Sequence, residues 1–238
     1  MTNAKSRCTR YNYVAALRHV LRDLTEMCGA PQCTQALPRL PTPRPRNITV
    51  TDDERTRLLA AAAPHLKLWL LLCSDLALRS GTAAFIAPQH YDHSAGELTF
   101  TTKYGERLTL PVTDQVAALI AQCDMHDPSP FTMQLHRAQG RRGPKPWHSR
   151  YYANSLRREF QQLLTALAIK RNLRPHDLRR TTAVAMLEAT RDIRCVQALL
   201  GHTNLASTFW YLDHHATPVN RATLELIKRP RWQQEKTA

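Results

Sequence analysis

The sequence lacks the features that mark membrane, secreted and nucleotide-binding proteins. Its longest apolar run, residues 66–73, is interrupted by Lys67 and is far shorter than the roughly 20 residues that span a bilayer. The N-terminal residues include Lys5 and Arg7 but no continuous apolar stretch of the kind found in secretory signals. With only seven glycines, the chain contains no Gly-x-x-x-x-Gly-Lys motif for cradling phosphates.

Cysteine pairs are missing as well. The six cysteines include no Cys-x-x-Cys pair, and their scattered spacing indicates isolated reduced thiols in a cytoplasmic protein. Zinc binding by Cys28 and Cys33 would need two histidines, and no suitably spaced pair follows them. His214 and His215 are adjacent and have no third ligand at helical spacing. We therefore expect neither a metal nor a cofactor.

Acidic side chains are scarce relative to basic ones. The 238 residues contain 19 Asp and Glu against 33 Lys and Arg, which gives a net charge of +14 and a pI near 10.0. This balance favours a polyanionic partner, with nucleic acid ahead of an acidic membrane. The hydrophobic content of 43% suits an ordinary core, and the length allows one sizeable domain plus a small one.

The N-terminal region divides into a helix, a stiff connector and a second helix. Apolar residues recur at helical spacing from Val14 to Cys28, so this segment is predicted to be one amphipathic helix. Residues 37–46 are rich in proline and arginine, which indicates an extended linker, with a solvated surface loop as the alternative. Thr51 and Glu54 have the spacing of a capping box at the start of the next helix.

The middle of the chain predicts a buried helix followed by a hairpin. The apolar residues 66–78 favour a buried helix whose end delivers Arg79. Alternating residues between 98 and 112 predict two antiparallel strands joined by a tight turn, with Lys103 at the turn end of the first strand. Taken alone, a lysine at a hairpin tip is usually only a solvated charge.

Two further helices and a loop are expected after the hairpin. Residues 113–123 form a short helical pattern, and residues 152–167 form a longer one. Between them, residues 124–148 contain many Pro, Gly and basic side chains. We predict a loop there, which either follows a DNA backbone or is simply solvated.

The C-terminal third places four polar residues on or beside helices. His176 and Arg179 are three positions apart, so they share one face of a helix. Residues 193–200 have the pattern of a core-facing helix and are followed by glycine, so His202 leaves the helix end at a sharp turn. The next apolar stripe leaves Tyr211 pointing out of the core.

This ordered set resembles the tyrosine recombinase family, which includes phage integrases and Xer-type recombinases. The match consists of His-x-x-Arg, Leu-Gly-His and the tyrosine nine positions later, with Arg79 and Lys103 standing for the family's first arginine and its hairpin lysine. The resemblance implies a mainly α-helical fold with a small antiparallel β-sheet, the DNA breaking-rejoining catalytic domain, over residues 47–238. Residues 1–36 would be the remnant helix of a shortened SAM-like core-binding domain, and residues 37–46 its linker.

The resemblance also implies a covalent mechanism. Tyr211 would attack a DNA phosphate and form a 3′-phosphotyrosyl link, with His176 as the general base. A forked guanidinium group can bind two phosphate oxygens, which is the role expected of Arg79 and Arg179. The covalent link conserves the energy of the phosphodiester, so rejoining would need no ATP.

Two further residues complete the implied site. Lys103 would protonate the departing 5′ oxygen, and His202 would hydrogen-bond the phosphate. The expected function is site-specific recombination for integration or excision of a mobile element. The expected partners are double-stranded DNA and further copies of the chain, which would form a tetramer. When bound to DNA, the protein would be associated with the nucleoid.

One position departs from the family pattern. The family usually carries an acidic residue three positions after its first arginine, and Thr82 stands there. This departure favours one alternative, a catalytically silent DNA-binding protein derived from an integrase. A type IB topoisomerase is the other alternative, because it uses similar chemistry without pairing two sites. Arg180 is expected to contact only phosphate or solvent at the surface.

Overall fold

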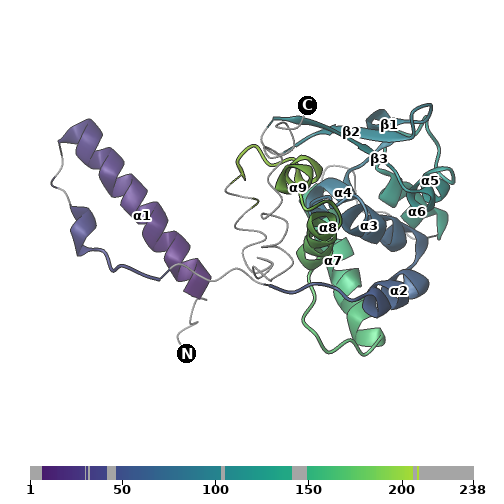
Figure 1. Ribbon diagram of the computed structural model, residues 1–238, viewed down its shortest axis with the longest axis horizontal. Coiled ribbons are helices and arrows are strands. Elements are labelled where there is room, and N and C mark those ends of the chain that lie inside the picture. The colour runs from purple at the N-terminus through teal and green to yellow at the C-terminus, as the bar shows by residue number, and fades with distance from the viewer. Residues whose placement is uncertain are drawn as a thin grey trace, which may run out of the picture. The chain divides into compact units, whose positions relative to one another are not determined.

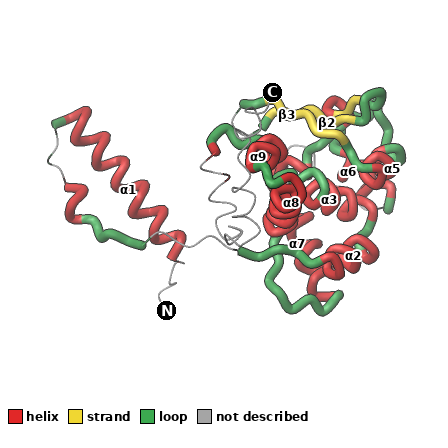
Figure 2. Tube along the Cα trace, viewed as in Figure 1, coloured by secondary structure: helices red, strands yellow, loops and turns green. Residues whose placement is uncertain are grey.

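The computed structural model describes residues 7–29, 31, 33–41, 47–102, 105–140, 149–205 and 208. Figures 1 and 2 show its α-helices, 3-10 helices (η) and strands. In chain order these are α1 (Arg7–Cys28), η1 (Cys33–Ala36), α2 (Asp52–Ala61), α3 (Pro64–Ser74), α4 (Ser80–Ala84), η2 (Pro88–His90), β1 (Tyr91–Asp92), β2 (Glu97–Thr101), β3 (Arg107–Pro111), α5 (Asp114–Ile120), α6 (Phe131–Ala138), α7 (Ser149–Ala166), α8 (Pro175–Thr190) and α9 (Ile193–Leu200).

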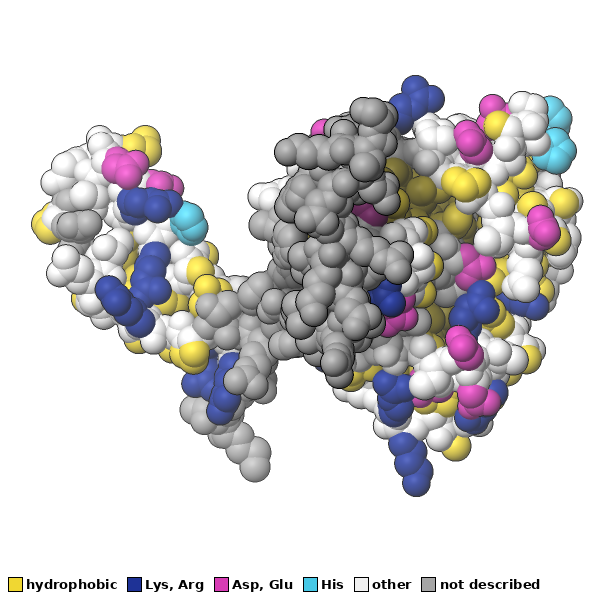
Figure 3. Space-filling model, viewed as in Figure 1, with side chains coloured by type: hydrophobic (Ala, Val, Ile, Leu, Met, Phe, Trp, Pro, Cys, Tyr) yellow, Lys and Arg dark blue, Asp and Glu magenta, His cyan; other side chains and the backbone are white. Residues whose placement is uncertain are grey.

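The chain forms two compact units, Met1–Arg46 and Asn47–Ala238. In the first unit the predicted helix is present as α1, and the Arg18 Nη2 group donates to the Leu37 and Pro38 carbonyls at 3.0 and 2.9 Å. No residue of α1 is buried. Figure 3 shows hydrophobic side chains between the basic ones on its surface. The exposed large apolar residues of α1 are Tyr13, Leu17, Val20, Leu24 and Met27.

Helix α3 forms the centre of the second unit. The five residues from Leu68 to Leu72 are at most 1% exposed, because α2, α4, α5, α6, α7 and α8 all contact α3. A helix that is apolar on every side is stable only when other elements surround it in this way. No helix among the described residues is both long and apolar enough to cross a membrane.

The sheet is small and antiparallel, with strand order β1-β2-β3. Leu98 pairs with Leu110 and Phe100 with Leu108, so the apolar residues of both long strands face the core. The short strand β1 has only two residues and gives no alternating pattern in the sequence. Helices with one small antiparallel sheet are the predicted fold class, which is thus confirmed.

The predicted capping box at the start of α2 is confirmed. Thr51 Oγ1 accepts from the Glu54 backbone N–H at 3.2 Å, and Glu54 Oε2 accepts from the Thr51 backbone N–H at 2.9 Å. Arg171 also binds Glu54 Oε2 at 2.7 Å, which joins α2 to the segment that leads into α8. The start of α2 is therefore fixed by a local capping box and by one contact with a distant segment of the chain.

Two predictions for the middle of the chain were wrong. The buried helix ends at Ser74 rather than at residue 78, because Ala77 adopts a left-handed backbone with φ of 51° and the chain turns there. Residues 124–148 contain helix α6 rather than only a loop. Phe131, Met133 and Leu135 of this helix are buried, and α6 packs on α3.

Candidate active site

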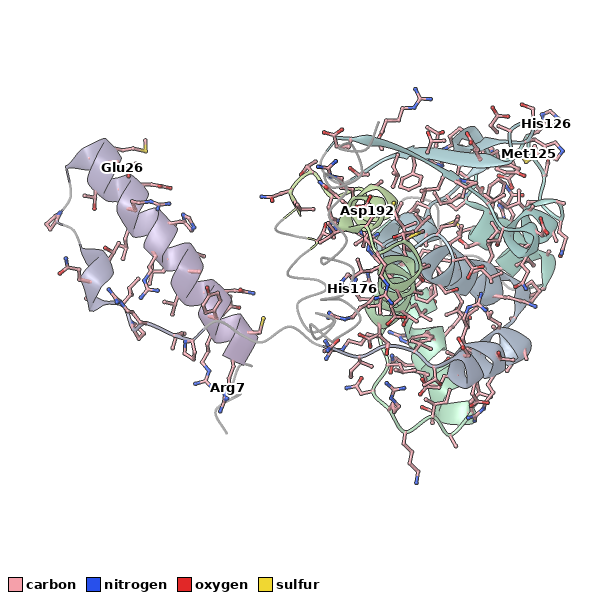
Figure 4. All side chains as sticks on the ribbon, viewed as in Figure 1. Arg7, Glu26, Met125, His126, His176 and Asp192 are labelled. Atoms are coloured by element: carbon pink, nitrogen blue, oxygen red, sulfur yellow. The ribbon has the colours of Figure 1, made fainter. Side chains whose placement is uncertain are left out.

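Helix α8 carries His176 and Arg179 one turn apart. Pro175 stands in its first turn, where a missing N–H costs nothing, and Asp177 Oδ2 accepts from the Arg174 backbone N–H at 2.8 Å. His176, labelled on this helix in Figure 4, is exposed, whereas Arg179 is only 3% exposed. The helix start thus presents one accessible imidazole and one buried guanidinium.

The guanidinium of Arg179 joins three segments of the chain. Its Nη1 donates to the Ala77 carbonyl, and its Nη2 donates to the Leu200 carbonyl at 2.9 Å. The same Nη2 lies 3.4 Å from His202 Nε2. Arg179 therefore holds together α8, the end of α9 and the turn that precedes Arg79.

Arg79 lies directly before α4 as its N-cap residue, not at the end of α3 as predicted. Its neighbour Ser80 is held from two sides. The Trp69 indole N–H donates to the Ser80 carbonyl at 2.9 Å, and Arg157 Nη2 donates to Ser80 Oγ at 3.0 Å. These two contacts fix the backbone beside Arg79. Thr82, three positions after Arg79, supplies no carboxylate there.

Gly201 brings the end of α9 against the hairpin. It has φ of 56°, as predicted for a left-handed helix end, and a Cβ atom at this position would lie 3.1 Å from the Thr102 methyl and 3.2 Å from Leu108 Cδ2. His202 follows immediately, and its Nδ1 lies 3.1 Å from Thr208 Oγ1. Arg179 Nη2 can only donate, so the facing His202 Nε2 accepts, and the neutral imidazole carries its proton on Nδ1, which donates to Thr208 Oγ1.

Desolvation and nearby arginines lower the pKa values of both histidines. Desolvation, together with the charges of Arg179 and Arg79, lowers the pKa of His202 to about 4. The pKa of His176 is lowered by the same causes, with Arg180 contributing as well. Arg79, His176, Arg179 and His202 are thus close enough to act on one another electrostatically, and the two imidazoles are bases rather than cations at neutral pH.

The sequence profile of the phage integrase family matches residues 49–217, which is most of the chain. The chain belongs to the phage integrase family. Among curated relatives, the tyrosine recombinase XerC of Psychromonas ingrahamii is 27% identical over 215 residues, covering 87% of this chain and 69% of that protein. XerC of Roseiflexus castenholzii is 30% identical over 219 residues, covering 86% and 67%. The chain therefore spans about two thirds of the length of these relatives.

Solved integrase-family structures share the fold. An integrase from mycobacterium phage Brujita is 24% identical, with a TM-score of 0.55, and the match covers 94% of this chain and 79% of that one. The XerH site-specific recombinase bound to its difH substrate, in a pre-cleavage complex, is 14% identical with a TM-score of 0.65, covering 95% and 66%. The resemblance to tyrosine recombinases predicted from the sequence is thus confirmed, and their catalytic domain is the fold of this integrase-family chain.

Two of the six predicted site residues, Lys103 and Tyr211, lie outside the described residues. Their near neighbours are described. Thr102, which precedes Lys103, packs on Gly201, and Thr208, three positions before Tyr211, contacts His202. The approach of Thr102 to Gly201 follows from the glycine itself, because a larger residue would meet the hairpin.

Sequence reasoning missed three residues that support this site in the integrase-family chain. Ser80, Arg157 and Thr208 contact or flank the predicted residues, but no short motif contains them, since Arg157 meets Ser80 across 77 positions. Arg180 was predicted to contact phosphate or solvent at the surface, and the surface alternative was wrong. Arg180 is only 4% exposed, and its charge helps to lower the pKa of His176.

Proposed function

We propose that this chain is a tyrosine-type site-specific recombinase that cuts and rejoins DNA through a 3′-phosphotyrosyl intermediate. One observation carries the proposal. Arg179 lies 3.4 Å from His202, and the charges of Arg79 and Arg179 act on both His176 and His202, although these residues come from separate parts of the chain. Two guanidinium groups beside two neutral imidazoles suit a reaction that builds negative charge on a phosphate and moves a proton.

The proposed step is a transesterification. The Tyr211 hydroxyl oxygen attacks phosphorus while its proton passes to His176, whose lowered pKa keeps the imidazole available as an acceptor. The bond from phosphorus to the 5′ oxygen breaks, and Lys103 gives that oxygen a proton. Arg79 and Arg179 stabilise the equatorial oxygens of the transition state. Attack of a 5′ hydroxyl on the phosphotyrosine reverses these events and reseals a strand without ATP.

The proposed partner is double-stranded DNA, bound by several copies of the chain. A net charge of +14 supports binding to a polyanion, and XerH, a site-specific recombinase of the same fold, is bound to its difH substrate. We extend the proposal to a tetramer that integrates or excises a mobile element. The unit Met1–Arg46 would then be part of a core-binding region, with residues 37–46 as its linker to the catalytic domain.

Covalent trapping tests the proposal directly. Because the target site is unknown, the substrate is a pool of nicked suicide duplexes with randomised sequence, from which covalent protein–DNA complexes are recovered. We expect a trapped complex for the parent chain and none for Tyr211→Phe, which should still bind DNA. An adduct that persists in Tyr211→Phe contradicts the assignment of the nucleophile.

The same experiment separates the two alternatives. DNA binding without any adduct in the parent chain would identify a catalytically silent protein, for which Thr82 is the supporting observation. Relaxation of a supercoiled plasmid that lacks any selected site would instead identify a type IB topoisomerase. Recombination between two selected sites on one plasmid is the result that the recombinase proposal requires.

A further inference from the structure

A second cluster of polar side chains lies among three helices of the catalytic domain. His65 is in the first turn of α3, His136 is in α6 and Glu159 is in α7. One potential metal-ligand atom from each residue lies within 4.8 Å of the other two. Among the described residues, this is the group of three His, Cys, Asp or Glu side chains arranged closely enough to hold a metal ion.

The arrangement of the two imidazole rings suits one shared ion. Their centroids are 4.7 Å apart and their planes are nearly perpendicular, at 89°. Two imidazoles on one tetrahedral zinc, each with a Zn–N distance of about 2.0–2.1 Å, have centroids about 5 Å apart. The spacing of the two rings is therefore close to that of two imidazoles on one ion, and binding requires the rings to turn until a nitrogen of each faces the metal.

The carboxylate of Glu159 supplies the third ligand. Its Oε2 lies 2.8 Å from His65 Nε2, as in a hydrogen bond, and a metal between the two atoms would replace the proton they share. His65 is fully buried, whereas the Glu159 side chain is 20% exposed. An ion can thus reach the cluster from the Glu159 side, and a water molecule can complete a tetrahedral set there.

Gln139 supports the orientation of His65. Its side-chain amide lies 3.0 Å from His65 Nδ1 and 3.0 Å from the Leu135 carbonyl. When His65 binds a metal through Nε2, its Nδ1 carries a hydrogen and needs an acceptor. In the structure Gln139 Nε2 donates to both the Leu135 carbonyl and His65 Nδ1, so metal binding through His65 Nε2 requires the Gln139 side chain to leave Leu135 and turn its Oε1 toward Nδ1.

We propose that His65, His136 and Glu159 form a binding site for a divalent transition-metal ion, with zinc as the best match to two imidazoles and a carboxylate. The ion would join α3, α6 and α7 and act as a structural clamp. The site shares no residue with the proposed recombination site. It is therefore independent of the proposed function.

Cobalt(II) and zinc titrations of the full-length chain, after removal of metal by a chelator, test the proposal. We expect one equivalent of Co²⁺ to give weak visible d–d bands without the intense near-ultraviolet band of a thiolate ligand. Zinc should displace the cobalt and raise Tm, since an ion at 100 times its Kd shifts the folding equilibrium about a hundredfold.

Three variants locate the bound ion. His136→Ala and Glu159→Gln should each weaken zinc binding at least about tenfold, and Glu159→Gln keeps an acceptor for the hydrogen bond from His65. His126→Ala is the matched control, because His126 is an exposed histidine in the loop before α6 and should leave binding unchanged. The proposal would be overturned if no stoichiometric binding occurred, if a thiolate band appeared, or if binding survived His136→Ala. The cluster would then be only a hydrogen-bonded network.

Discussion

Replacing Arg179 by alanine should lower stability much more than replacing Arg79, although both changes should abolish most cleavage. Arg179→Ala removes the charged donor from two buried carbonyls, those of Ala77 and Leu200. A buried polar group left without its partner costs about 1–3 kcal/mol, so the expected loss is about 3 kcal/mol for the pair once some water enters. For a unit of this size that loss lowers Tm by roughly 6–12 °C.

Arg79→Ala should behave differently. Arg79 is only partly buried and its side chain makes no capping hydrogen bond at the start of α4, so we expect a loss of about 1 kcal/mol or less. Each variant should lose cleavage of the trapped suicide substrate by about 100-fold or more, as when one donor to a transition-state oxyanion is removed. The stability difference between the two arginines is therefore a property of the fold and not of the chemistry.

Thermal and urea unfolding followed by circular dichroism, run beside the cleavage assay, measure both effects. Arg179→Lys is a useful third variant, because it keeps the charge but cannot reach both carbonyls with a planar fork. A Tm for Arg179→Ala within about 2 °C of the parent would refute the argument from the buried carbonyls. A loss of stability in Arg79→Ala as large as that in Arg179→Ala would refute the contrast.

Three further predictions concern the surroundings of the site. Gly201→Ala should lower the free energy of unfolding by about 1–2 kcal/mol in a urea titration, because alanine is strained in the left-handed backbone conformation and its methyl group meets Thr102 and Leu108. An unchanged midpoint would show that the hairpin moves freely. Stability should fall as the pH drops from 6.5 to about 4, because His202 takes up a proton first in the unfolded chain; His202→Gln should make this slope shallower, and an identical slope would contradict the lowered pKa. Arg157→Ala should slow cleavage while leaving DNA affinity nearly unchanged, because it releases Ser80 beside Arg79; a parallel loss of affinity would argue for a direct DNA contact instead.

Local sequence patterns determine several features of the structure of this protein. The capping box of Thr51 and Glu54, the left-handed Gly201 and the alternating strands depend on residues within a few positions of one another, so the sequence specifies them without tertiary information. The fold class and the order of the predicted site residues follow from the same short-range features and from the family resemblance.

Other features, including helix α6 and the contacts between distant segments, depend on the tertiary structure. Helix α6 is short and follows a turn-rich segment, and it is stable because Phe131 and Leu135 are buried in contact with neighbouring elements. Arg179 bonds to Ala77 across 102 positions, and Arg157 bonds to Ser80 across 77, so no spacing rule could reveal either contact. The His65, His136 and Glu159 cluster likewise exists only because three helices meet. A helix or turn is set by neighbours along the chain, whereas a site is set by which distant segments the core brings together.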